Sequence, residues 1–256
     1  MNKKLITFLL LPAALVGVSC SSHYQLDSVS RSRILVDASY DATQDKEAAD
    51  FIAPYKQKVD SVMSPVVGRA AQYLYAERPE SNLSNLLADV LVWGGKAYNE
   101  KPDFSVYNMG GIRAAFAKGD ITFGDVLDVA PFENKICFLT LKGSKVLELF
   151  AQIAMVGGES VSRGVELVIT KDGRLVSARL DGKEIDADRE YRVATLDYLA
   201  QGNDNMEAFK SGYNANSPAS ADNNVRYIIV RYMKEKMAQG IDIDSKIEGR
   251  IKIEGK

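Results

Sequence analysis

The irregular order of helical and strand patterns along residues 46–256 constrains the fold more than any other feature. Apolar residues at helical spacing occur in 51–75, 86–93, 144–154 and 225–237. Apolar runs or alternations typical of strands occur in 104–107, 135–141, 165–170, 175–180, 190–195 and 247–253. Helices and strands are thus mixed without a regular βαβ repeat. The sequence therefore predicts an α+β or layered α/β fold.

Local signals mark the ends of several predicted elements. Ser64-Pro65 interrupts the first helical pattern, because proline lacks a backbone donor. Ser81 offers a helix cap, Thr122 opens a helical turn within 121–129, and Asp181-Gly182 predicts a hairpin. No repeat or low-complexity tract divides the chain. We therefore expect one domain over residues 46–256.

The first 45 residues have the pattern of an export signal followed by a tether. Two lysines precede an apolar run over 5–18, which is shorter than the ~20 residues that a membrane-spanning helix needs. The run ends at Ser19-Cys20 and resembles a bacterial lipobox. We expect a lipoprotein signal peptide over 1–19, lipidation of Cys20, and a polar tether over 20–45. A plain signal peptide with an incidental cysteine is the alternative.

The second cysteine, Cys137, lies in an apolar run, so we expect it to be buried and inert. A disulfide to Cys20 would require the mature N-terminus to dock on a core strand. The formal net charge is −2, and no block of lysines and arginines stands out. Binding to a nucleic-acid polymer is therefore not expected.

Histidine is nearly absent, which restricts the chemistry that the chain can perform. The single histidine, His23, falls in the tether. Paired-metal phosphatase sites use several imidazole ligands, and a serine nucleophile needs a base such as histidine. An acidic magnesium site at Asp120, Asp125 and Asp128 is the alternative, although these residues are better suited to solvent exposure or helix capping. We expect neither a catalytic residue nor a metal or other cofactor in this chain.

Three turns carry polar and aromatic residues: 108–113 (Asn-Met-Gly-Gly-Ile-Arg), 131–134 (Pro-Phe-Glu-Asn) and 197–204. Each has a structural interpretation when taken singly. Consecutive glycines after a strand permit positive φ or close approach, an arginine can pair at the surface, and Pro-Phe can pack at a turn. Their order and spacing together are more specific.

The run from Asn85 to Phe209 resembles the C-terminal domain of the 5′-nucleotidase family. The matching segments are 85–89, 108–113, 119–126, 131–132, 141–143 and 191–204. The resemblance implies a single domain of α-β-β-α layers that recognises a nucleoside or nucleotide. It also implies that two aromatic rings, here Phe132 and Tyr198, enclose the base. Stacking on aromatic rings tolerates any base, so one such site can serve several nucleosides. Asp204 matches the residue that holds the ribose hydroxyls, and Asn108 and Asn134 match residues that contact base or ribose.

The phosphate contacts implied by the resemblance are less complete. Arg113 matches an arginine that grips the phosphate. A second arginine is usual where this chain has Glu77, and the neighbouring Arg78 is the candidate substitute. The turn at Asp204 is usually Gly-Gly-Asp-Gly, whereas here Asn203 and Asn205 flank the aspartate. Asparagine tolerates left-handed backbone, so we expect the turn to survive.

Full-length members of this family place a metallophosphatase domain before the recognition domain. We therefore expect the chain to supply substrate recognition in nucleotide catabolism, with a separately encoded metallophosphatase as partner, and not to be catalytic alone. A stand-alone, membrane-tethered nucleoside-binding lipoprotein is the main alternative, and an envelope scaffold with a decayed site is a third. The expected location is the bacterial cell envelope, facing the periplasm.

Overall fold

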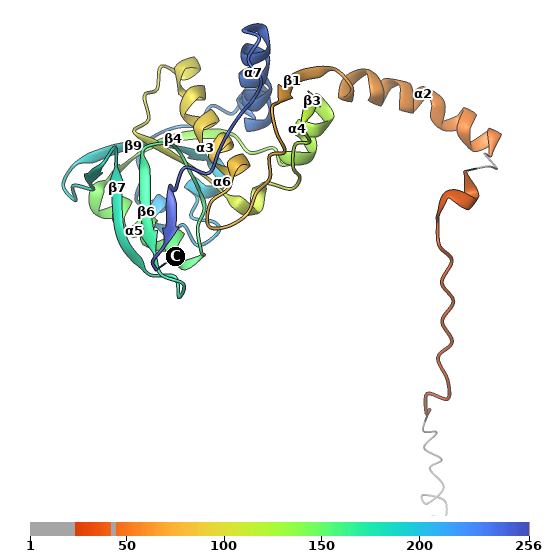
Figure 1. The fold of residues 1–256 in the computed structure, drawn as a ribbon, viewed down its shortest axis with the longest axis horizontal. Helices are drawn as coiled ribbons and strands as arrows, with labels where there is room; N and C mark the ends of the chain where they lie inside the picture. The colour runs from red at the N-terminus through yellow and green to blue at the C-terminus, as the bar shows by residue number, and fades with distance from the viewer. Residues whose placement is uncertain (1–23, 42–44, 256) are drawn as a thin grey trace, which may run out of the picture. The chain divides into compact units, whose positions relative to one another are not determined.

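The computed structural model describes residues 24–41 and 45–255, which fall into two compact units that divide after Phe51. The signal peptide, Cys20 and His23 lie outside the described residues. In the first unit, residues 24–36 form no helix or strand, and η1 (Ala38–Tyr40) is one 3₁₀ turn. Helix α2 (Lys46–Met63) crosses the division and ends before Ser64-Pro65, as predicted (Figure 1). Within the described ranges, no helix is long and apolar enough to span a membrane.

A five-stranded sheet of order β10-β4-β9-β2-β5 forms the centre of the larger unit. The strands are β2 (Phe104–Tyr107), β4 (Ile136–Lys142), β5 (Ser160–Val161), β9 (Glu190–Leu196) and β10 (Tyr213–Asn216). Strand β9 pairs antiparallel with β4 along its whole length and parallel with β2. The end of β2, the end of β9 and the start of β4 therefore lie at the same edge of the sheet.

Helices α3 (Asn82–Gly94), α4 (Phe123–Val129) and α7 (Val225–Ala238) pack on one face of this sheet. Ile136 and Phe138 of β4 point into the core between them. A small antiparallel pair, β1 (Val66–Ala70) with β3 (Gly119–Thr122), closes this core beside α7.

The alternate residues of β4, including Cys137 and Leu139, point into a second core on the opposite face. Helix α5 (Gly143–Met155) fills this core and also contacts the second sheet (Figure 1). That sheet has the order β11-β6-β7-β8, with β6 (Val165–Ile169), β7 (Leu175–Leu180), β8 (Lys183–Glu184) and β11 (Ile251–Ile253). Cys137 is buried and free, and its burial raises the pKa of the thiol.

Short elements connect the strands: η2 (Gly95–Tyr98), η3 (Met109–Gly111), α6 (Asp197–Ala200), η4 (Glu207–Ser211) and η5 (Ala221–Asn223). Two helix starts carry the predicted caps. Ser81 forms a capping box with Ser84, and Thr122 forms one with Asp125. Each such cap stabilises a helix by about 1 kcal/mol. The carboxylate of Asp125 is therefore used in helix capping.

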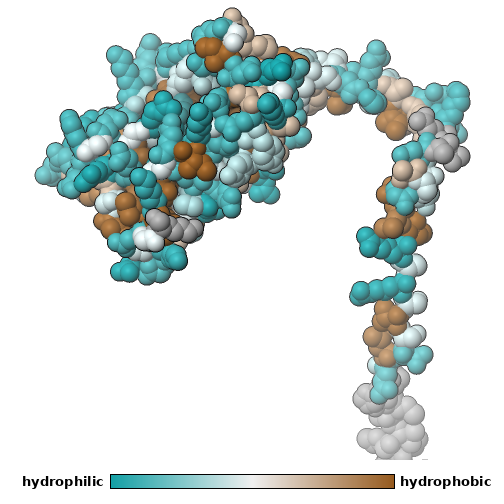
Figure 2. Space-filling model, in the orientation of Figure 1, coloured by the Kyte–Doolittle hydropathy of each residue, from teal (hydrophilic) through white to brown (hydrophobic). Residues whose placement is uncertain are grey.

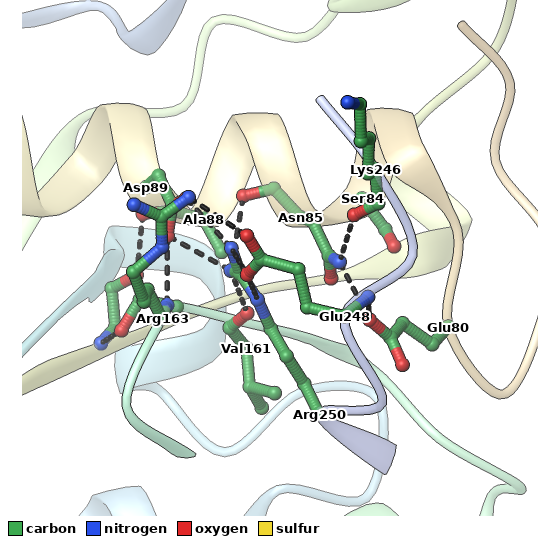
Figure 3. A network of polar contacts seen from close by, with 12 residues as sticks. Glu80, Ser84, Asn85, Ala88, Asp89, Val161, Arg163, Lys246, Glu248 and Arg250 are labelled. Carbon is green, nitrogen blue, oxygen red and sulfur yellow. Dashed lines mark hydrogen bonds and ion pairs between the residues drawn. The ribbon is translucent and has the colours of Figure 1, made fainter. Parts of the chain in front are cut away.

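A buried charge network ties the C-terminal segment to α3 (Figure 3). The Arg250 side chain, 3% exposed, binds the Asp89 carboxylate at 2.8 and 2.7 Å and also contacts Glu248. Glu80 accepts hydrogen bonds from the backbone amides of Glu248 and Gly249 and from the Asn85 side chain. Because a buried charge without partners is costly, this network holds the segment that leads into β11.

The predicted mixed α+β class is confirmed, and most elements begin and end within a few residues of their expected positions. The extension of the first helical pattern through 66–75 was wrong, because residues 66–70 pair with β3 as a strand. The predicted edge strand over 247–253 is confirmed only for 251–253. The surface of the larger unit seen in Figure 2 is mostly hydrophilic, with scattered apolar residues, as expected when these cores are filled.

Candidate functional site

The three predicted turns meet at one pocket of about 210 Å³. Its lining residues are Asn108, Gly110, Phe132, Asn134, Tyr198 and Asp204. The first turn follows β2, the second precedes β4, and the third follows β9. These strands are neighbours, and the relevant ends share one edge of the sheet, so segments far apart in sequence are brought together.

Two aromatic rings in the pocket are exposed to solvent. Phe132 is 50% exposed although it lies just before the buried strand β4, and Tyr198 is 37% exposed although it lies just after the buried strand β9. An exposed phenylalanine contributes little to folding, because its apolar surface stays in water. The two rings are therefore available for stacking with a planar ligand.

Asp204 is the centre of the polar side of the pocket. Its Oδ2 accepts a hydrogen bond from Asn108 Nδ2 at 2.8 Å, and its Oδ1 accepts one from the Tyr198 hydroxyl at 2.9 Å. The bond to Asp204 raises the pKa of the Tyr198 hydroxyl. Each carboxylate oxygen has about two acceptor positions, so both retain capacity for a further donor. Asn108 is 5% exposed, and its Oδ1 is buried without a hydrogen-bond partner.

The turn around Asp204 has left-handed backbone at three positions, and only one of them is a glycine. Gly202, Asp204 and Asn205 have φ of 82°, 55° and 64°. The left-handed residues other than glycine are therefore Asp204 itself and Asn205, whereas Asn203 does not have positive φ. The Asn203 side chain instead donates to the Tyr198 carbonyl at 2.8 Å. This bond fixes the backbone between the aromatic residue and the aspartate.

Three residues that support the pocket were not predicted from the sequence: Asp197, Glu159 and Arg226. Asp197 Oδ1 accepts the backbone amides of Lys135 at 3.0 Å and Tyr198 at 2.8 Å, so one carboxylate joins two pocket segments. Asp197 lies in the first turn of α6, where carboxylates are favoured, but this helix was not predicted from the sequence.

Glu159 lies behind the Asn108 turn with its side chain 1% exposed. One oxygen accepts the Met109 backbone amide, and the other forms an ion pair with Arg78. Burial raises the pKa of the Glu159 carboxyl, while the Met109 amide and the Arg78 charge oppose that rise. No local motif distinguishes this glutamate.

Neither predicted phosphate-binding arginine lines the pocket. Arg113 is exposed, and its Nη1 donates to the Gly110 carbonyl at 3.1 Å, which places it next to a lining residue. Arg78 donates from Nε to the Gly158 carbonyl at 2.7 Å in addition to its pair with Glu159. The pocket therefore unites the five residues expected to bind base and ribose but neither arginine.

The described part of the chain contains no group of three or more histidine, cysteine, aspartate or glutamate side chains arranged to hold a metal ion. The acidic alternative at Asp120, Asp125 and Asp128 finds no support, since Asp125 binds Thr122 and Asp120 lies near Arg69.

Comparison with known proteins bears directly on this pocket. The family model described as 5′-nucleotidase, C-terminal domain, matches residues 66–211, more than half of the chain. The chain belongs to this family. The matched region contains every residue that lines the pocket.

Relatives and solved structures agree with this assignment. The chain is 28% identical over 199 residues to a 5′-nucleotidase of Vibrio parahaemolyticus, covering 74% of this chain and 34% of the relative. It is 31% identical to a trifunctional nucleotide phosphoesterase of Bacillus subtilis, covering 82% of this chain and 15% of the relative. A 5′-nucleotidase precursor of Thermus thermophilus superposes with a TM-score of 0.71 at 27% identity, covering 83% and 44% of the two chains. The chain thus spans about a third or less of these curated relatives.

Proposed function

We propose that the chain is the nucleoside- or nucleotide-recognition component of a 5′-nucleotidase-type phosphohydrolase in nucleotide catabolism. A separately encoded metallophosphatase is the proposed partner that supplies the metals and the attacking water. The observation that carries this proposal is the pocket in which two exposed rings, Phe132 and Tyr198, accompany the carboxylate of Asp204.

The chemistry of these groups matches the parts of a nucleoside. A planar base stacks on exposed aromatic faces, and each stacked ring contributes about 1–3 kcal/mol to binding whatever the base. The free acceptor positions of Asp204 suit a pair of vicinal hydroxyl groups, such as those of ribose. The amides of Asn108 and Asn134 offer hydrogen bonds to base or sugar.

Nucleoside binding is better supported than phosphate binding. Arg113 is exposed, does not line the pocket, and uses one N–H group on the Gly110 carbonyl. Arg78 is engaged by Glu159 and Gly158. We therefore propose that the base and ribose supply most of the affinity, and that a phosphate group adds little until the partner is present.

The proposed location follows from the N-terminal pattern. Lipidation of Cys20 would anchor the chain to a membrane of the bacterial cell envelope, with the folded unit in the periplasm. The test is metabolic labelling with a palmitate analogue: wild-type chain is expected to incorporate label, and Cys20→Ala is not. Incorporation by the Cys20→Ala chain would exclude this anchor.

Calorimetry with adenosine and AMP tests the recognition role. Phe132→Ala and Tyr198→Ala are each expected to weaken adenosine binding by about 5- to 150-fold, the equivalent of one stacked ring. Tyr73→Ala is the matched control, since Tyr73 is 59% exposed and lies outside the pocket. Absence of saturable binding at millimolar adenosine would refute the recognition role.

Phosphate release from AMP tests the partnership. The chain would be assayed alone, with a candidate exported metallophosphatase, and with the same metallophosphatase plus the Phe132→Ala variant. We expect the wild-type mixture to be faster than the metallophosphatase alone, and the variant mixture to lose that gain. Binding without any gain in rate would assign the chain instead to a tethered nucleoside-binding lipoprotein.

A further inference from the structure

A buried arginine on α7 holds the loop that carries Phe132. Arg226 is 8% exposed and lies in the first turn of the helix. Its Nε donates to the Ala130 carbonyl at 3.0 Å, and its Nη2 donates to the carbonyls of Pro131 at 2.6 Å and Phe132 at 3.4 Å. One planar side chain therefore binds three successive carbonyls of this loop.

The start of α7 is an unfavourable place for the positive charge of Arg226. A positive charge near a helix N-terminus opposes the helix dipole, and burial adds a desolvation cost. The acceptors offset these costs. Ala130 is the C-cap residue of α4, so its carbonyl lies at the negative end of that helix, where a cation is favoured. The planar fork of a guanidinium suits several acceptors at once, whereas a lysine ammonium does not provide that geometry.

The same turn of α7 also holds the far end of the loop. The Val225 backbone amide donates to the Asn134 carbonyl at 2.9 Å. The carbonyls of residues 130, 131, 132 and 134 are thus all bound by two consecutive residues of α7. The hydrogen bonds from the first turn of α7 therefore fix the backbone of both pocket residues of this loop, Phe132 and Asn134. The Phe132 ring itself is half exposed, so burial alone does little to fix its position.

We infer that Arg226 is a positioning residue for nucleoside recognition, acting through the Phe132 ring without touching the ligand. This inference rests on the proposed function. It predicts that loss of the guanidinium fork lets the 130–134 loop move, so that the ring spends less time in the stacking position. The affinity for a nucleoside then falls although every pocket residue is still present.

The test uses the full-length protein in detergent, with adenosine as the probe in calorimetry. Arg226→Lys is expected to weaken adenosine binding roughly tenfold. This loss lies within the range of binding energy that one stacked ring contributes. Arg250→Lys is the matched control, because Arg250 is also buried and binds carbonyls but lies outside the pocket. Both variants are expected to lower Tm, whereas only the first is expected to change affinity. Arg226→Gln replaces the lysine variant if that variant does not fold.

A double-mutant cycle separates positioning from a general loss of stability. In the Phe132→Ala background, Arg226→Lys is expected to have no further effect on adenosine affinity, because the ring through which it acts is absent. Hydrogen exchange of residues 130–134 is expected to speed up in Arg226→Lys and not in Arg250→Lys. An unchanged affinity in Arg226→Lys, or an equal effect in both backgrounds, would overturn the inference. Wild-type protein that binds no adenosine would refute the proposed function first.

Discussion

Asp204→Asn separates the contribution of the carboxylate to ribose binding from its contribution to the fold. In the structure, Asp204 accepts from Asn108 at 2.8 Å and from the Tyr198 hydroxyl at 2.9 Å. Asparagine at this position keeps one carbonyl for Asn108 and turns its amide toward the tyrosine hydroxyl, which can accept. It also tolerates the φ of 55°. We therefore expect little change in the free energy of unfolding.

The expected loss of affinity can be worked out per ribose hydroxyl. A hydrogen bond to a charged group contributes about 1.5–3 kcal/mol, against about 0.5–1.5 kcal/mol for a neutral pair. The difference is about 1 kcal/mol for each hydroxyl that Asp204 accepts. Two hydroxyls give about 2 kcal/mol, or roughly 30-fold weaker binding of adenosine. For 2′-deoxyadenosine, which lacks one hydroxyl, the expected loss is only about fivefold.

Calorimetry with both ligands on wild-type and variant protein measures these losses, and urea denaturation measures stability. Asp204→Ala serves as the contrasting variant. It removes both acceptors, leaves the buried Asn108 amide unpaired, and places alanine at positive φ, so about 1–3 kcal/mol of stability should be lost as well. Equal losses for adenosine and 2′-deoxyadenosine in Asp204→Asn would refute the assignment of Asp204 to the ribose.

Three further variants probe the Asn108 turn. A Cβ on Gly111 would lie 2.5 Å from Asn108 Oδ1, so Gly111→Ala should displace that amide, lower the unfolding free energy and weaken adenosine binding about tenfold in calorimetry. A Cβ on Gly110 would meet only Asp204 Oδ2, at 4.0 Å, so Gly110→Ala should leave the unfolding free energy unchanged. An equal loss of unfolding free energy in the two variants would contradict this. The pKa of Glu159 is raised in the folded state, so its contribution to stability is fully present below the unfolded pKa and is lost as pH rises through the folded pKa. Urea denaturation between roughly pH 4 and pH 8, a range that begins near the ordinary carboxyl pKa, measures this effect. The free energy of unfolding of the wild type should fall with rising pH relative to that of Glu159→Gln. A constant difference between the two proteins across this range would disprove the reasoning.

The sequence predicted the parts of the molecule whose physics is local. Helix α3 could be placed because Ser81 caps it and its apolar face recurs at helical spacing. Strand β7 could be placed because its residues alternate between turn signals. Strand β1 was mistaken for helix because its apolar residues fit either period and its partner β3 lies about fifty residues away in sequence. Pairing between distant strands leaves no mark on either segment alone.

The pocket shows the same division between the side chains that line it and the side chains that hold its segments in place. The residues that line the pocket were predictable because their turns carry recognisable types in a recognisable order. The supporting bonds were not: Glu159 reaches Met109 across 50 positions, Asp197 reaches Lys135 across 62, and Arg226 reaches Pro131 across 95. In each case an ordinary charged side chain binds a backbone group, and almost any charged residue could serve if the fold brought it there.

These supporting bonds explain how the pocket keeps exposed rings in place before a ligand arrives. A half-exposed ring gains little from packing, so its position must be set by the backbone beneath it. The carboxylates of Asp197 and Glu159 and the guanidinium of Arg226 each bind backbone groups of a different pocket segment. Because these bonds are charge-assisted and at least partly buried, we expect the segments to be ordered before a ligand binds. If the pocket binds a nucleoside as proposed, less affinity is lost to ordering the loops, which is the advantage of a preorganised site.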